Sequence, residues 1–265
     1  MKVVRNVFTA LAVLCAASTF AFAESATKNS PAPLSTGAGF EAEAGNRHEW
    51  LDKGYKDWSD SWVRLQQKSE GGGLLYGAAR QTERFSIVDN EYSVGVYMPV
   101  TDTVSFTADA GYSPTHQVLA RWAAFAGVEA AVSGWGLAAG YKRTEYDVSR
   151  VDMGVFRVEK YAGDFRAAYT FYPVHVDNAG SVSSHAFRLD WFYGDKSFVG
   201  AGYAAGREAE SGGASGILIS DVEEYSIVCK QWLTRDWSLA FDTGTHRQSP
   251  YYTRNWVSIG IRRTF

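Results

Sequence analysis

Hydrophobic and polar residues alternate with a period of two along most of the chain after residue 37. Between Tyr92 and Met98 every second side chain is large and apolar, and residues 104–110, 165–172, 187–193 and 237–242 follow the same rule. Helical periodicity is almost absent. Because successive side chains of a strand point to opposite faces, this pattern predicts an all-β protein.

The alternating segments are long, and their second face is charged at mid-segment. Many run for about 10 residues, the length that a tilted strand needs to cross a bilayer, whereas strands of soluble proteins are usually shorter. Charges at mid-strand are costly in the core of a soluble sandwich but suit a water-filled lumen. The charged side chains expected to face such a lumen are Arg64, Asp109, Glu129, Lys142, Arg166, Arg188, Asp190, Glu224, Lys230, Asp242 and Arg262.

The connections between these segments alternate in length. Short turns are predicted at 70–73, 100–103, 132–134, 162–164, 194–196 and 234–236, and longer loops at 46–57, 84–90, 114–121, 174–183, 209–221 and 247–253, with a shorter link at 146–149. Barrels of the outer membrane have short periplasmic turns and longer external loops. The sequence therefore predicts a transmembrane antiparallel up-and-down β-barrel of about fourteen strands, with both ends in the periplasm. Alternation is weakest at 37–45 and 148–160, which leaves about twelve strands as the alternative.

The N-terminus has the features of a secretory signal peptide. Lys2 and Arg5 precede an apolar stretch, and Ala21-Phe22-Ala23 is a small-residue cleavage site. The apolar stretch falls short of the roughly 20 residues that a spanning helix needs, which disfavours a membrane anchor. The predicted organisation is a signal peptide at 1–23, a flexible periplasmic lead at 24–36 and a barrel at 37–265.

Composition and charge narrow the choice of partners. The chain is 46% hydrophobic and 15% aromatic, which is too apolar for a disordered protein. Its formal net charge of −3 provides no field that would attract nucleic acid. We expect contact with outer-membrane lipid and no nucleic-acid partner, and a small solute or a glycan is the ligand class that remains open. Nothing in the sequence calls for a cofactor.

The chain ends on an alternating segment whose final residue is Phe265. Val257, Ile259 and Phe265 share one face, so this segment is expected to be the last strand and to close the barrel against the first. Outer-membrane barrels commonly end in such a strand, with a final aromatic residue that their assembly machinery recognises. The chain resembles that class, so Phe265 is expected to be an assembly signal. Arg263 departs from the pattern, at a place where a long side chain can reach the polar interface.

Five stretches of the chain are distinctive in their order and spacing: WVRLQQKS at 62–69, YGAARQTERFSIVDNEYSVGVY at 76–97, GYSPTH at 111–116, RLDWFYGDKSFVGAGYAAGRE at 188–208 and YTRNWVSIGIRRTF at 252–265. Together they resemble the YaiO family of outer-membrane β-barrel proteins. The most specific element is Arg84 and Asp89 followed by Tyr92 and Gly95. The resemblance implies a single outer-membrane barrel but no mechanism. Related barrels in exopolysaccharide export suggest a glycan-related role by analogy alone.

Two groups of residues are candidates for recognition. Arg84 and Asp89 flank an expected external loop, where a bridge between them would either hold the loop or contact a ligand. Arg188 and Asp190 lie two residues apart and share a face, and such mixed charges suit either a structural network or the selection of a solute. Four bulky residues expected to point inward would narrow or plug the lumen, namely Trp62, Tyr97, Phe156 and Phe192.

A hydrolase at the external rim is the alternative function. Asp242 and His246 share one face of an expected strand and Ser249 lies nearby, but four residues of strand separate the first two by about 13 Å. No G-x-S-x-G motif is present, and the five histidines show no metal-binding spacing. We therefore expect a non-enzymatic protein without a catalytic or metal site, either a narrow passive pore or a surface-exposed accessory protein. A soluble periplasmic β-sandwich is a third class.

Overall fold

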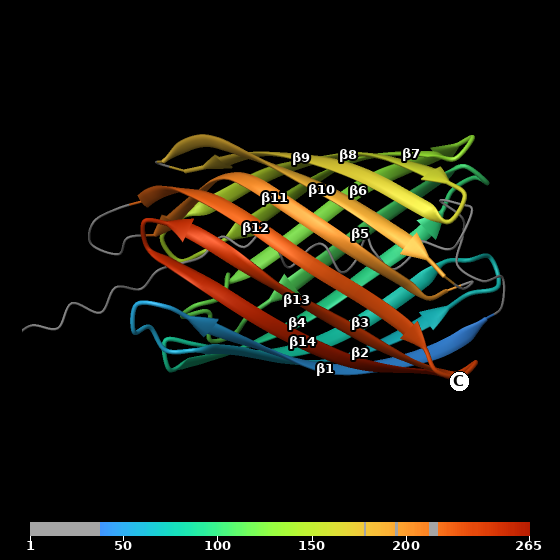
Figure 1. Ribbon diagram of the computed structural model, residues 1–265, viewed down its shortest axis with the longest axis horizontal. Coiled ribbons are helices and arrows are strands. Elements are labelled where there is room, and N and C mark those ends of the chain that lie inside the picture. Colours follow the sequence, from blue (N-terminus) through green and yellow to red (C-terminus); the bar gives the residue numbers. More distant parts are fainter. Residues whose placement is uncertain (1–37, 178, 194–195, 212–216) are drawn as a thin grey trace, which may run out of the picture.

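The computed structural model describes residues 38–177, 179–193, 196–211 and 217–265, and these form a closed barrel of fourteen antiparallel strands (Figure 1). Each strand pairs with its neighbours along the chain, and the first pairs with the last. The predicted signal peptide at 1–23 and lead at 24–36 lie outside the described residues. The strands are β1 (Gly39–Leu51), β2 (Trp58–Lys68), β3 (Leu74–Arg84), β4 (Ile87–Pro99), β5 (Val104–Tyr112), β6 (Trp122–Val132), β7 (Trp135–Glu145), β8 (Arg150–Ala162), β9 (Phe165–Val176), β10 (Gly180–Phe192), β11 (Phe198–Ser211), β12 (Ile217–Trp232), β13 (Trp237–Ser249) and β14 (Tyr252–Thr264).

The two ends of the barrel differ in their connections. We call the end where β1 begins and β14 ends the terminal rim, which lies at the right of Figure 1, and the opposite end the distal rim. The connections at the terminal rim agree with the predicted short turns. They are 69–73, 100–103, 133–134, 163–164, 193–197 and 233–236, of which residues 194–195 are not described.

Most connections at the distal rim are shorter than predicted. The loops expected at 84–90 and 247–253 are wrong, because two-residue links at 85–86 and 250–251 join these strands. Those expected at 46–57 and 174–183 shrink to 52–57 and 177–179. The loops near 114–121 and 146–149 are found where they were predicted, whereas residues 212–216 of the loop predicted at 209–221 lie outside the described part.

The turn between β3 and β4 shows why a long loop was wrongly predicted there. Phe85 and Ser86 both take left-handed backbone conformations, with φ of 52° and 68°. Two such residues match the twist of a tight hairpin, but Gly, Asn and Asp are the usual residues at these positions. The sequence therefore lacked the customary signal for a two-residue turn.

The barrel closes between β1 and β14, as predicted for the terminal segment. The pairing runs from Glu41 opposite Thr264 to Leu51 opposite Arg254. It ends with the backbone N–H of Phe265 donating to the carbonyl of Phe40 at 2.8 Å. The Phe265 side chain lies on the outer wall and is 63% exposed, and the guanidinium of Arg263 lies 4.6 Å from its ring centroid.

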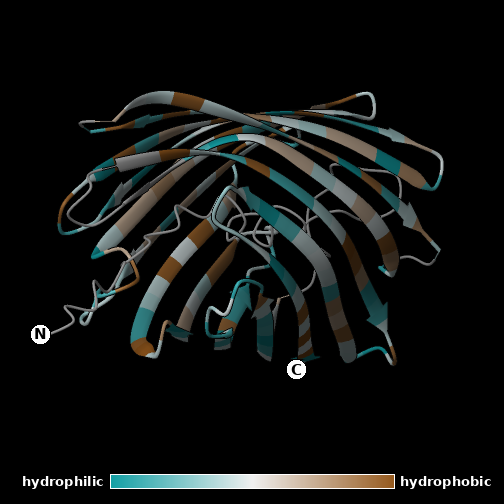
Figure 2. Ribbon diagram, turned by 60° about the vertical axis from the view of Figure 1, so that its left-hand side comes forward, coloured by the Kyte–Doolittle hydropathy of each residue, from teal (hydrophilic) through white to brown (hydrophobic). Residues whose placement is uncertain are grey.

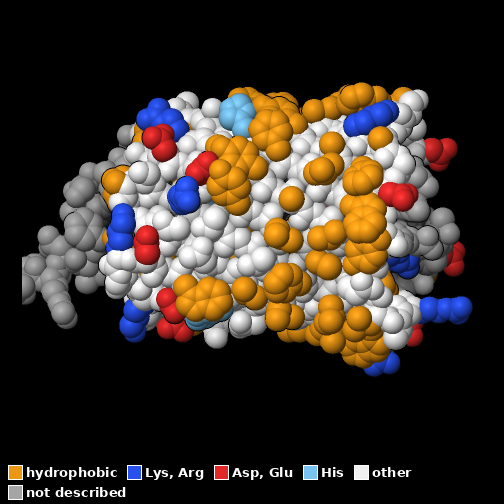
Figure 3. All heavy atoms as spheres, in the orientation of Figure 1, with side chains coloured by type: hydrophobic (Ala, Val, Ile, Leu, Met, Phe, Trp, Pro, Cys, Tyr) orange, Lys and Arg blue, Asp and Glu red, His pale blue; other side chains and the backbone are white. Residues whose placement is uncertain are grey.

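The outer wall carries an apolar band and a polar belt. Hydrophobic and hydrophilic residues follow one another along the strands (Figure 2), and hydrophobic side chains cover the middle and right-hand part of the face in Figure 3. Nearer the distal rim, outward residues form polar contacts, such as Gln81 with Asn90 at 3.2 Å and Arg143 with Asp152 at 2.7 Å. This arrangement is that of a wall whose middle contacts hydrocarbon and whose distal part contacts polar groups.

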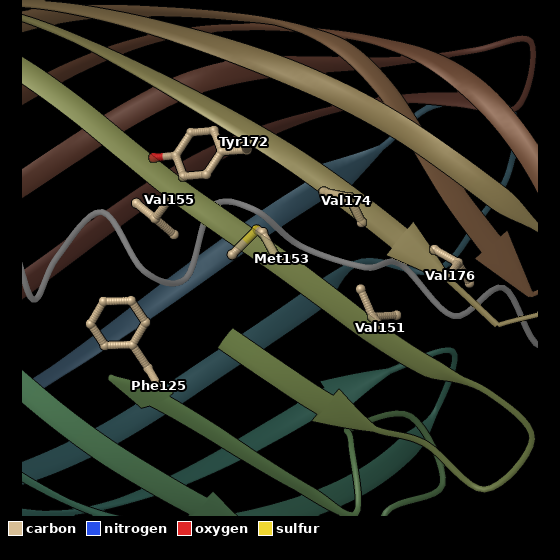
Figure 4. Close-up of a cluster of buried hydrophobic side chains, with 7 residues drawn as sticks. All are labelled: Phe125, Val151, Met153, Val155, Tyr172, Val174 and Val176. Carbon is tan, nitrogen blue, oxygen red and sulfur yellow. The ribbon is translucent and has the colours of Figure 1, made fainter. Parts of the chain in front are cut away.

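Strand β8 reverses one prediction about the lumen. Phe156 lies on the outer wall and is 50% exposed, so the expectation that it narrows the lumen is wrong. Its neighbours on the opposite face belong to a buried apolar cluster that projects into the barrel (Figure 4). Because both faces of β8 carry apolar residues, the sequence held too little alternation to set the register. The cluster consists of Phe125, Val151, Met153, Val155, Tyr172, Val174 and Val176.

Candidate functional site in the barrel lumen

The lumen is the candidate site, because the predicted charged residues meet there. Two cavities, of about 130 and 360 Å³, lie inside the barrel. Among the eleven predicted residues, Glu129 and Asp190 do not line these cavities but bond to the lining residues Arg157 and Arg166. The other nine line one or both cavities: Arg64, Asp109, Lys142, Arg166, Arg188, Glu224, Lys230, Asp242 and Arg262.

Asp190 holds together the charges on the β9–β10 wall. Its carboxylate accepts hydrogen bonds from Arg166 and Arg188, each at 2.8 Å, and Asp190 is fully buried. Gly200 lies opposite Asp190 on β11, and a Cβ at this glycine would lie only 2.0 Å from the Asp190 Oδ1 atom. The missing side chain of Gly200 therefore leaves the space that the carboxylate fills.

A second network joins the two closing strands near the terminal rim. The Arg262 guanidinium bonds to Glu43 and lies 3.4 Å from Glu41. The indole N–H of Trp62 also donates to Glu43, at 3.1 Å, and Lys68 forms an ion pair with Glu41. Both glutamates belong to β1, whose alternation was weak in the sequence, and for that reason neither was predicted.

A third network lies on the same wall toward the distal rim. Arg254 on β14 and Glu49 on β1 form a buried ion pair at 2.9 Å, with both side chains only 1% exposed. Arg47 forms a second ion pair with Glu49 at 2.8 Å, and its guanidinium also lies 4.6 Å from the Trp256 ring centroid. Arg47 and Glu49 fall in the segment that was predicted to be the loop 46–57, and Arg254 directly follows the loop predicted at 247–253, which explains why these charges were missed.

Large aromatic side chains of the lumen lie flat over glycines of neighbouring strands. A Cβ at Gly45 would lie 2.2 Å from the Trp62 ring, and one at Gly95 would lie 2.4 Å from the Tyr76 ring. Gly244 gives space to Trp256 in the same way. Because these rings follow the wall, they take up less of the cross-section than rings that point across it. The expectation that Trp62 obstructs the lumen is therefore not supported by its position.

The remaining bulky residues of that prediction lie elsewhere. Phe192 is buried in a small cluster with Tyr161 and Phe198 at the terminal rim. Tyr97 shares the inward face of β4 with Gly95 and Glu91 near the same rim. Phe192 and Tyr97 therefore lie near the terminal rim and not in the middle of the lumen.

Arg84 and Asp89 do not form an ion pair with each other. The Asp89 carboxylate is buried and accepts hydrogen bonds from the backbone N–H groups of Val118 and Leu119, at 2.6 and 2.9 Å. Asp89 thus holds the loop 113–121 and not the loop that was expected between the two residues. Arg84 faces the lumen, where its guanidinium lies 4.8 Å from the centroid of the Trp58 ring.

Replacement of Asp89 by alanine is expected to release the loop 113–121 while the barrel stays closed. Two buried backbone N–H groups would lose their acceptor, at a cost of about 1–3 kcal/mol each. Limited proteolysis of the folded protein should then cut at Arg121, the basic residue of this loop, much faster than in the parent. Asp102→Ala in the exposed turn 100–103 is the control, and equal cleavage in the two variants would contradict the assignment.

The three residues of the alternative hydrolase site do not form a triad. Asp242 accepts the indole N–H of Trp256 at 2.7 Å, and the imidazole of His246 lies 3.1 Å from the Glu224 carboxylate. No hydrogen bond between Asp242, His246 and Ser249 occurs in the described part of the chain. The described part of the chain contains no cluster of three or more His, Cys, Asp or Glu that could bind a metal ion. It also contains no helix that is long and apolar enough to span a membrane.

The closed antiparallel wall, its apolar band and its charged lumen define an outer-membrane β-barrel protein. The model of the YaiO membrane beta barrel domain matches residues 40–211, and the chain belongs to this family. No curated protein sequence matches the chain significantly.

Three solved structures share the fold at low sequence identity. The CymD monoaromatic hydrocarbon channel has a TM-score of 0.59 and 9% identity, and the match covers 86% of this chain and 88% of that one. OmpF of Salmonella typhi, solved with daunomycin, has a TM-score of 0.52 and 10% identity, over 86% and 97% of the two chains. Omp33 of Acinetobacter baumannii has a TM-score of 0.51 and 12% identity, and the match covers 86% of this chain and 99% of that one. At these identities the likeness concerns the fold alone.

Proposed function

We propose that this protein is a narrow passive pore that admits small polar solutes across the outer membrane of a Gram-negative bacterium. The observation that supports this proposal is the position of the aromatic rings in the lumen. The rings of Trp62, Tyr76 and Trp256 lie against glycines of the wall, and cavities of about 130 and 360 Å³ remain between charged side chains. A structural barrel would have no need of such glycines, because its interior would fill with side chains.

The charges of the lumen support passage of polar solutes. Ion pairs on opposite walls, such as Arg166 with Asp190 and Arg254 with Glu49, fix charged groups around the passage without a dense cluster of one sign. Such a wall can bind hydroxyl and carboxylate groups briefly and release them, as conduction requires. A role in the traffic of envelope polysaccharide fragments fits this chemistry, but rests on analogy with related barrels.

The orientation and biogenesis follow from the same class. The terminal rim, with its short turns, is assigned to the periplasm, and the distal rim with the loop 113–121 to the exterior. Export by a signal peptide at 1–23, a periplasmic lead at 24–36 and recognition of Phe265 by the barrel-assembly machinery complete the proposal. Recovery of the protein in the soluble periplasmic fraction would contradict it.

Single-channel recording in a planar bilayer tests the pore. The protein is purified in detergent from membranes of a Gram-negative host, and its folded state is verified by heat-modifiable migration on a gel. We expect small, reproducible current steps. A correctly folded barrel that gives no steps would overturn the pore and would favour the accessory role at the cell surface.

A further inference from the structure

The guanidinium of Arg84 forms neither an ion pair nor a hydrogen bond with a described residue, although Asp60 and Glu49 attract it from a greater distance. Arg84 is 6% exposed, and no described residue accepts a hydrogen bond from its side chain. Its position is fixed by the ring of Trp58, on which it lies at 4.8 Å, and Trp58 is itself packed edge-to-face against Phe85 and Tyr252. A buried guanidinium without an acceptor costs free energy, so its retention in a fixed position indicates an anion supplied from outside.

The carboxylates nearest to Arg84 are occupied by other groups. Glu49 bonds to Arg254 at 2.9 Å and also to Arg47. Asp60 accepts the hydroxyl of Thr82. Because these acids already have partners, the Arg84 side chain keeps donors that are able to bind a further anion.

A second guanidinium on the same face of β3 is only partly satisfied. Arg80 lies four residues before Arg84 and lines the same cavity. It is paired with Glu91 at 3.2 Å, while its Nε atom is buried without a hydrogen-bond partner. Four residues of strand separate the two backbone positions by about 13 Å, so Arg84 is the anchor for the anion and Arg80 adds positive charge to the same cavity.

One part of the same cavity wall is apolar. The cavity of about 360 Å³ is lined by Arg80 and Arg84 and also by Met153 and Val155 of the inward cluster. Figure 4 shows Met153 and Val155 projecting from β8 into the barrel. A cavity of this volume suits a small molecule that presents an anionic group to one side and an apolar ring face to the other.

We propose that this cavity binds a small ring-bearing carboxylate, whose carboxylate pairs with Arg84 and whose ring faces the apolar wall. The proposal names the solute class of the proposed pore and rests on it for the route of entry. Binding itself does not require conduction. Two sources share this chemistry, an aromatic acid and a sugar acid, and benzoate and glucuronate represent them in the test.

Equilibrium binding to the detergent-folded protein tests the proposal. Benzoate and glucuronate are titrated separately by calorimetry into the parent, Arg84→Gln, Arg84→Lys and Arg207→Gln. The last variant is the control, since Arg207 lies on the outer wall in an exposed pair with Asp221. Heat-modifiable migration identifies the folded variants, and Arg84→Lys keeps the charge should Arg84→Gln fail to fold.

We expect at least one acid to bind the parent, and Arg84→Gln to weaken this binding by about tenfold to a hundredfold, the effect of a lost charge-assisted hydrogen bond. Arg84→Lys should lose less, because it keeps the charge without the planar fork, and Arg207→Gln should bind as the parent does. Binding of benzoate alone would identify an aromatic acid, and binding of glucuronate alone a sugar acid. No binding of either acid, or equal affinity in Arg84→Gln, would overturn the site.

Conductance separates this outcome from that of the pore. A protein that binds one of the acids but gives no current steps would retain the site and lose the pore. Current steps without binding would retain the pore and remove the site. In a conducting protein that binds the acid, the added acid should block the current of the parent more strongly than that of Arg84→Gln.

Discussion

Replacement of Asp190 by alanine is expected to lower the free energy of unfolding by about 3–5 kcal/mol. Asp190 is fully buried, and its carboxylate is the acceptor for both Arg166 and Arg188. Without it, Arg166 retains Glu159 at 3.8 Å, while Arg188 has no other acid within ion-pair distance among the described residues. Removal of one partner from a buried ion pair is costly, because it leaves an uncompensated charge behind.

The measurement is urea unfolding of the protein in lipid vesicles, followed by tryptophan fluorescence. Asp221→Ala serves as the matched control, since Asp221 is 84% exposed and lies 3.7 Å from Arg207, in a pair that solvent screens. The control should unfold at the same urea concentration as the parent. A similar loss in the two variants, or none in Asp190→Ala, would show that the network on β9 and β10 does not stabilise the wall.

Replacement of Gly95 by alanine is expected to narrow the lumen and to reduce single-channel conductance, by about twofold or more. A Cβ at Gly95 would lie 2.4–2.6 Å from three atoms of the Tyr76 side chain, two of the ring and the hydroxyl oxygen. All three belong to the far part of one side chain, so the ring rotates away from the wall and the backbone stays in place. The guanidinium of Arg64, which lies 4.2 Å from the centroid of the Tyr76 ring, moves with it.

Two further variants make this prediction sharp. Gly77→Ala is the control, because Gly77 lies on the outer face of β3 and a Cβ there would approach nothing closer than 3.9 Å. In a Gly95→Ala background, Tyr76→Ser removes the displaced ring and should restore conductance. A Gly95→Ala protein that conducts like the parent would contradict the view that these glycines keep the lumen open.

The sequence predicted the strand count and the family, because the signals for both are repeated along the chain. Alternation recurs in most strands, and the short turns at the terminal rim contain glycine or aspartate at 71–73, 134 and 163–164. The distal ends of the strands were harder to predict. There the outward residues are polar, as with Gln81 and Asn90. Polar residues on both faces of a strand remove the alternation, and the sequence then reads like that of a loop.

The partners within the lumen could not be predicted for a different reason. The alternation places Arg166 and Asp190 on inward faces, but the bond between them depends on the register of β9 against β10. Glu49 and Arg254 meet only because the barrel closes. The lack of an ion pair at Arg84 could not be predicted either. It arises because Arg47 and Arg254 pair with Glu49, and because Thr82 bonds to Asp60.

The seam between β1 and β14 constrains the order in which the wall can form. Every other pairing in the barrel joins neighbouring strands, whereas this one brings together Glu41 and Thr264, which lie 223 positions apart. A chain made from its N-terminus must therefore keep the free edge of β1 unpaired until the final strand has emerged. An exposed strand edge is a template for aggregation, and bringing such distant segments together is slow. The topology therefore requires that β1 be protected until β14 is available. Variants that weaken only the β1–β14 pairing should slow closure of the barrel and promote aggregation during refolding.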